Sequence, residues 1–87
     1  SVSISITNST TSDGNLIYTL SADTQIKNPT YQWYEGTPDT SNIIYGESNK
    51  LLIRNKTDEY KSYSVKVVDA LNTDVSSVSQ IFTIQPV

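Results

Sequence analysis

The chain alternates apolar and polar residues with the two-residue period of β-strands, most clearly at its start. There, Val2, Ile4 and Ile6 share one face, and serine or threonine residues occupy the other. Strict alternation predicts a strand that buries one face against a core. Asp13-Gly14 follows within a polar segment and predicts a chain reversal, because these residue types favour tight turns.

Further strands are predicted wherever a short apolar run stands between polar turns. They cover residues 16–21, 30–35, 43–45, 50–55 and 63–68, with a last strand that runs from residue 75 or 78 to residue 84. In the strand over 50–55, Leu51 and Ile53 share one face, and we expect that face to point into the core. The phase of the last strand stays open, because Ile81 and Phe82 are adjacent.

The pattern as a whole predicts an all-β fold. No segment shows a sustained 3.6-residue period, and seven or eight short strands with regularly spaced turns are typical of two antiparallel sheets packed as a sandwich. A chain of 87 residues forms one domain, so we expect residues 1–87 to be a single unit. Because it begins at Ser1 and contains no methionine, we expect it to be excised from a longer chain.

Three segments, taken in order, resemble the immunoglobulin-like family. Tyr31-Gln32-Trp33-Tyr34 resembles its third strand, where an inward tryptophan precedes an outward tyrosine. Residues 51–55 (Leu-Leu-Ile-Arg-Asn) resemble the run before its sixth strand, and Tyr63-x-Val65 resembles the Tyr-x-Cys of that strand. Since the chain has no cysteine, it resembles the cysteine-less immunoglobulin-like domains of tailed-phage virion proteins and bacterial surface proteins.

This resemblance implies a role for several residues. Trp33 would lie between the sheets, and Leu20 and Val65 would occupy the two cysteine positions. A disulfide there contributes roughly 4 kcal/mol, and two buried aliphatic side chains contribute about 1.5–3 kcal/mol each, so the exchange is nearly neutral. Tyr63 would form a tyrosine corner, with its hydroxyl bonded to backbone at the preceding turn. The predicted core comprises Leu20, Trp33, Leu51, Ile53, Tyr63, Val65 and Val67.

The match to the family has two departures. Glu59 stands where the family usually has aspartate, and Lys61 stands where it often has glycine. A fibronectin type III domain is the nearest alternative, but that family places its core tryptophan on the second strand, where this chain has Tyr18. Immunoglobulin-like is therefore the favoured sandwich.

Charge and composition restrict the partners. The net charge is −3, and the six basic residues are scattered along the chain. Nucleic acids and anionic membrane surfaces need a basic face, so neither is an expected partner. No apolar run is long enough to cross a membrane as a helix.

The chain has few side chains that are suited to catalysis or to metal binding. The chain has no histidine and no cysteine, which excludes Ser-His-Asp and Cys-His triads and sites built on imidazole or thiolate. Asp58 and Glu59 are adjacent and so point apart, and we interpret them as a solvated turn. Weak calcium binding needs only oxygen ligands, which the loops expected at one end carry: Asp23, Glu47, Asp69, Asn72 and Asp74. Their spacing matches no calcium motif, so we expect no metal site. Since the side chains of the usual catalytic motifs are missing, we also expect no enzyme and no cofactor.

Exposed tyrosines are the remaining candidates for a contact surface. Tyr34, Tyr45 and Tyr60 are expected to be partly exposed, and Tyr34 and Tyr45 are the candidate contacts. Tyrosine rings stack on sugars and anchor protein partners. The favoured alternative is that these rings only cover the flank of a sheet.

The resemblance implies a non-catalytic module rather than a defined activity. In phages, such domains point outward from capsid decoration or tail proteins and hold weakly to host-surface glycans. The first hypothesis is therefore a module on a virion surface whose partners are the neighbouring domains of its parent chain and host carbohydrate. The alternatives are a spacer or adhesion domain of a bacterial cell-surface protein and an accessory module of a secreted glycosidase.

Overall fold

The computed structural model describes residues 1–87 and contains seven strands and two short 3-10 turns. The strands are β1 (Val2–Thr10), β2 (Leu16–Thr24), β3 (Pro29–Glu35), β4 (Leu51–Asn55), β5 (Ser62–Asp69), β6 (Asn72–Val78) and β7 (Phe82–Thr83). The turns are η1 (Thr40–Asn42), between β3 and β4, and η2 (Lys56–Asp58), between β4 and β5.

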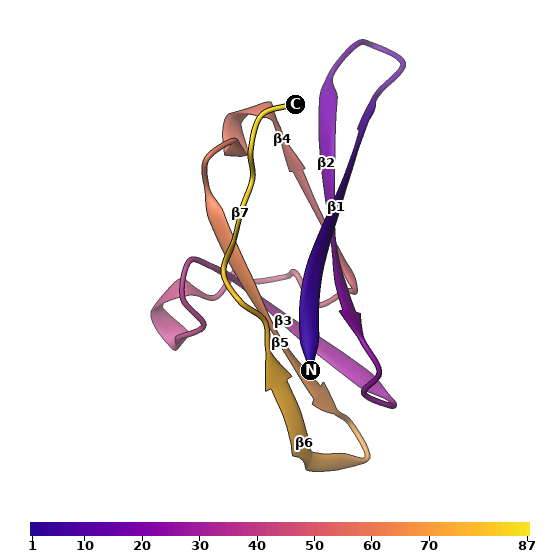
Figure 1. The fold of residues 1–87 in the computed structure, drawn as a ribbon, viewed down its shortest axis with the longest axis vertical. Helices are drawn as coiled ribbons and strands as arrows, with labels where there is room; N and C mark the ends of the chain where they lie inside the picture. The colour runs from indigo at the N-terminus through magenta and orange to yellow at the C-terminus, as the bar shows by residue number, and fades with distance from the viewer.

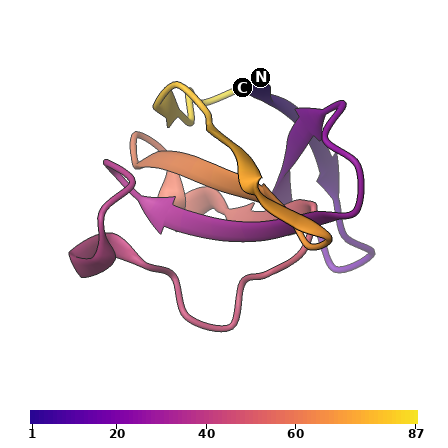
Figure 2. The same ribbon diagram turned by 90° about the horizontal axis from the view of Figure 1, so that it is seen from below.

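The strands form two antiparallel sheets that face each other (Figures 1 and 2). One sheet has the order β1-β2-β4, and the other has the order β3-β5-β6, with β7 also paired to β5. This arrangement corresponds to the A-B-E and C-F-G strands of immunoglobulin-like sandwiches. The two-sheet, all-β fold expected from the sequence is therefore confirmed, and it is closed without a disulfide.

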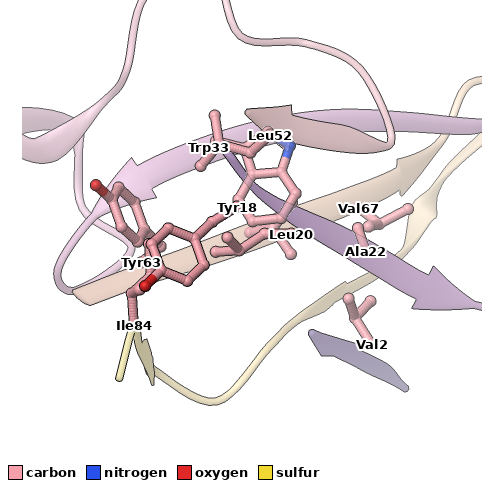
Figure 3. Close-up of a cluster of buried hydrophobic side chains, with 10 residues drawn as sticks. Val2, Tyr18, Leu20, Ala22, Trp33, Leu52, Tyr63, Val67 and Ile84 are labelled. Atoms are coloured by element: carbon pink, nitrogen blue, oxygen red, sulfur yellow. The ribbon is translucent and has the colours of Figure 1, made fainter. Parts of the chain in front are cut away.

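The core lies between the sheets and is built around Trp33 (Figure 3). Trp33 and Val65 are opposite each other on β3 and β5, and both are completely buried. Leu20 is also completely buried, so both expected cysteine positions hold core aliphatic residues. The indole Nε1 of Trp33 donates a hydrogen bond to the carbonyl of Asn49 at 2.8 Å, so its polar atom is satisfied. Burial is likewise confirmed for Tyr63 and Val67.

Strand β4 has the opposite phase from the one expected. Leu52 is completely buried, whereas Leu51 and Ile53 are 46% and 51% exposed, so assigning those two residues to the core was wrong. The register explains the phase, because Leu52 lies directly opposite the inward-facing Leu20. Opposed residues of an antiparallel pair share a face, so Leu52 must point inward with Leu20.

Tyr63 fills the core but makes no corner bond. Its hydroxyl is buried and has no hydrogen-bond partner, so the expected bond to the preceding turn is absent. The Arg54 guanidinium lies 5.6 Å from the centre of the Tyr63 ring. Burial, and then the nearby negative charge of Asp58, raise the pKa of Tyr63 to about 12.

The turn before β5 is held by Asp58, which was expected to be solvated and is instead buried. Its carboxylate accepts a hydrogen bond from the backbone N–H of Asn55 at 3.0 Å, and the Asn55 side chain accepts from Thr57 N–H at 2.9 Å. The Asp58 contact is one half of a capping box on η2, and the other half joins the Asn55 side chain to the backbone of Asp58. The carbonyl of Asp58 already accepts from Lys61 N–H at 3.0 Å, so this turn satisfies itself without Tyr63.

The last strand is interrupted at Ser79, which resolves its phase. The N–H of Val65 donates to Ser79 Oγ at 3.0 Å, and the N–H of Ser79 donates to the carbonyl of Val65 at 3.0 Å. The serine hydroxyl thus takes the place of a strand carbonyl, and β6 ends before β7 begins. As a result Ile81 is half exposed, whereas Ile84 is completely buried.

Candidate functional site

Tyr45 is the most exposed aromatic side chain, at 83%. It lies in the long connection between β3 and β4, which reaches away from the sandwich in Figure 2. Glu47 N–H donates to the carbonyl of Ile44 at 3.3 Å, so Tyr45 and Gly46 form the two central residues of a turn. Gly46 has φ +85°, a value that favours glycine at the second central position. The turn therefore holds the Tyr45 ring out into solvent.

The first half of this connection is held by Asp39. Its carboxylate accepts hydrogen bonds from the hydroxyl and the N–H of Ser41, the latter at 3.0 Å, and from the Thr37 hydroxyl at 3.0 Å. The hydroxyl bonds of Ser41 and then Thr37 hold the pKa of Asp39 below its usual value. The Asn42 amide donates back to the carbonyl of Thr37 at 3.0 Å. These bonds order the chain between β3 and the Tyr45 turn.

Tyr34 does not join Tyr45 at the surface, so its assignment as a surface contact was wrong. Only 7% of Tyr34 is exposed. The chain folds back along β3, where Ile44 N–H donates to the carbonyl of Trp33 at 3.0 Å and an isolated bridge joins Tyr34 to Ile43. That bridge is all that forms of the strand expected over 43–45. Tyr60 is 71% exposed but lies in a different connection, between η2 and β5.

The acidic residues considered for calcium are not gathered into a site. No group of three or more acidic, histidine or cysteine residues is close enough to hold a metal ion. Asp23 accepts hydrogen bonds from Ser5 and Ser21 at 2.6 and 2.9 Å, which lower its pKa, and Glu47 pairs with Arg54 at 3.4 Å. The other expected ligands are Asp69, which accepts from Leu71 N–H at 2.9 Å, and the exposed Asn72 and Asp74.

A second surface feature, which the sequence did not indicate, is a groove between β1 and the C-terminal segment. It contains two neighbouring cavities of about 160 and 250 Å³ that share Phe82 in their walls. We call this feature the terminal groove. Its apolar lining consists of Val2, Ile4, Ile6, Tyr18, Ile81, Phe82 and Val87. The signal that could have revealed it is the absence of charge from both ends of the chain.

Comparison with known protein families, curated proteins and solved structures gives no match. The helical segments, η1 and η2, are each three residues long, and neither is long and apolar enough to cross a membrane.

Proposed function

We propose that this domain is a non-catalytic immunoglobulin-like module displayed on the outside of a phage virion, where Tyr45 makes weak contacts with host-surface glycans. The observation that supports this proposal is the 83% exposed Tyr45 ring, held on an ordered turn. A tyrosine face stacks on the apolar face of a sugar ring, and its hydroxyl remains available for a hydrogen bond. Because the turn is already ordered, little conformational entropy is lost when a sugar binds.

A single exposed ring gives only weak binding. Aromatic contacts contribute about 0.5–1.5 kcal/mol each beyond the area they bury, whereas a dissociation constant of 1 mM needs about 4 kcal/mol, so one domain alone would hold a glycan at millimolar affinity or weaker. Many copies on one particle would bind a glycan-coated surface together, and such multivalency raises the apparent affinity by about 10²–10⁴. Weak individual contacts therefore suit a module that is displayed in many copies.

A glycan array tests this proposal directly. The domain is coupled to a tetrameric carrier and compared with Tyr45→Ala and with Tyr60→Ala, which removes another exposed ring, at 71%, from a different loop. We expect Tyr45→Ala to lose about tenfold or more of the array signal, and Tyr60→Ala to keep it. An array on which no glycan is bound, or a Tyr45→Ala signal equal to that of the unmodified domain, would contradict the proposal.

A second role, as a spacer in a bacterial surface protein, is favoured by the shape of the domain. The molecule measures 43 × 25 × 21 Å, and its two chain ends lie at different heights along the long axis (Figure 1). A module of this shape extends a chain along one direction. Tandem copies in the parent protein would favour this role over virion display.

A further inference from the structure

The charged side chains are distributed unevenly along the chain, and this leaves the terminal groove without charge in its lining. All fifteen lie between Asp13 and Asp74, so residues 1–12 and 75–87 carry none. These two segments are far apart in sequence but together line the terminal groove. Two carboxylates lie next to these residues, and both already accept hydrogen bonds. Asp23 accepts from the Ser5 hydroxyl, and Glu59 accepts from the Tyr18 hydroxyl. In a domain of net charge −3, the lining of the terminal groove thus contains no charged side chain.

The long edge beside the terminal groove is β1, which pairs with β2 alone. Ala22 N–H donates to the carbonyl of Lys50, so the even-numbered residues of β2 direct their backbone groups toward β4. By the alternation of antiparallel pairing, the odd-numbered residues of β1 bond to β2. The backbone groups of the even-numbered residues therefore face outward along the free edge: Val2, Ile4, Ile6, Asn8 and Thr10.

The other edges carry protection that β1 lacks. Strand β6 contains Asp74 and lies beside a register shift in β5, and β3 is covered by the bridge to Ile43. Strand β4 is short and contains Arg54. By contrast, β1 has nine residues, no proline, no charge and an unbroken register with β2. Natural sandwiches use charges, bulges and proline to prevent strands from adding to an edge, so β1 is open to another strand.

We propose that a second copy of this chain binds here, with the two β1 strands antiparallel across a two-fold axis. An added strand must be extended and uncharged, and it must place aliphatic side chains over the terminal groove. Strand β1 has these properties itself, because Val2, Ile4 and Ile6 alternate with serine and threonine. A net charge of −3 disfavours self-association through any charged face, and this face avoids that repulsion.

A register with the axis at Ile6 satisfies both copies. Ile6 then faces its own equivalent, and Ile4 faces Asn8 of the second copy. Because opposed residues share a face, the aliphatic side chains of both strands point toward the two grooves. The two three-stranded sheets become one continuous sheet, and about ten backbone hydrogen bonds join them. The half-exposed Ile81 lies where the second copy would cover it.

The expected contact is small. Nine residues span about 30 Å, and a strip of that length buries less than the roughly 800 Å² per partner of a stable complex. We therefore expect a dissociation constant of about 10–500 µM, which gives a monomer in dilute solution and a dimer at high local concentration. This association is independent of glycan binding by Tyr45.

Analytical ultracentrifugation from about 5 µM to 1 mM tests the proposal by comparing the unmodified domain with two lysine variants. A lysine on a strand edge prevents another strand from pairing there, so only a lysine on β1 should weaken the dimer. Thr7→Lys places a charge on β1, and Ile53→Lys places one on the exposed apolar face at β4. We expect Thr7→Lys to weaken self-association at least tenfold and Ile53→Lys to leave it unchanged, with both variants folded by circular dichroism. A domain that is monomeric at 1 mM, or one in which only Ile53→Lys disrupts the dimer, would overturn it.

Amide hydrogen exchange tests the register of the contact. On raising the concentration, the amides of Ile4, Ile6 and Asn8 should gain protection, because their N–H groups face the free edge. The amides of Ser5 and Thr7 should not change, because they already bond to β2. Equal protection of odd and even amides, or protection confined to another strand, would contradict the β1 pairing.

Discussion

Removing the buried hydroxyl of Tyr63 should stabilise the domain. The hydroxyl makes no hydrogen bond, yet it lies in a completely buried residue. A buried polar group without a partner costs about 1–3 kcal/mol, because it leaves its hydrogen bonds to water behind. Tyr63→Phe removes that cost and keeps the ring that fills the core. We expect the free energy of unfolding to rise by about 1 kcal/mol and the melting temperature by about 4–8 °C.

Tyr18→Phe is the matched control, because Tyr18 is equally buried but its hydroxyl donates to the Glu59 carboxylate. Loss of a hydrogen bond to a charged group costs about 1.5–3 kcal/mol, so this variant should be less stable. Urea denaturation followed by tryptophan fluorescence measures both variants on the same scale. If both substitutions destabilise the domain by similar amounts, the Tyr63 hydroxyl has a partner and the reasoning is refuted.

The Tyr63 hydroxyl should also make the stability of the domain depend on pH in the alkaline range. An unfolded tyrosine ionises near pH 10, whereas the pKa of Tyr63 in the folded domain is raised to about 12. Between these values the unfolded state loses a proton that the folded state keeps, so stability falls as the pH rises from about 10 to about 12. In Tyr63→Phe this contribution is absent, and the fall in melting temperature over that range should be shallower.

Three further predictions concern strand β4, the η2 turn and the Asp23 carboxylate. Leu52→Ala should cost about 2–5 kcal/mol and Leu51→Ala less than about 0.5 kcal/mol, as measured by urea denaturation; similar costs would show that β4 has the other phase. Asp58→Ala removes the capping box of η2 and should lower the free energy of unfolding by about 1–2 kcal/mol, and an unchanged thermal midpoint would contradict that role. Hydrogen bonds from Ser5 and Ser21 lower the pKa of Asp23 in the folded domain, so its contribution to stability should be lost as the pH falls below about 4. In Asp23→Asn the melting temperature should therefore fall less steeply over that pH range, and an unchanged slope would argue against the two serine bonds.

Periodicity predicted the strands with one apolar and one polar face. It failed at β4, because Leu51-Leu52-Ile53 is apolar at every position and gives no phase. Only pairing with Leu20 determines which of these residues points inward. The unpaired hydroxyl of Tyr63 could not be predicted from the sequence either, because it depends on which backbone groups of the neighbouring turn are already hydrogen-bonded to each other.

The candidate site was predictable only in part. The exposure of Tyr45 follows from a polar, glycine-containing segment between strands. Tyr34 is on the outer face of β3 as the alternation implies, but it is buried, and the returning chain pairs with it at Ile43, a contact that no local pattern encodes. The terminal groove likewise arises only when residues from opposite ends of the chain come together.

Trp33 provides the most direct test of the sandwich, because it is the single tryptophan and lies at the centre of the core. Its fluorescence and the exchange rate of its indole N–H report on that one site. A sealed indole bonded to the carbonyl of Asn49 predicts blue-shifted emission, resistance to iodide quenching and an indole proton that exchanges only on global unfolding. Red-shifted emission that iodide quenches freely in the native domain would contradict the account.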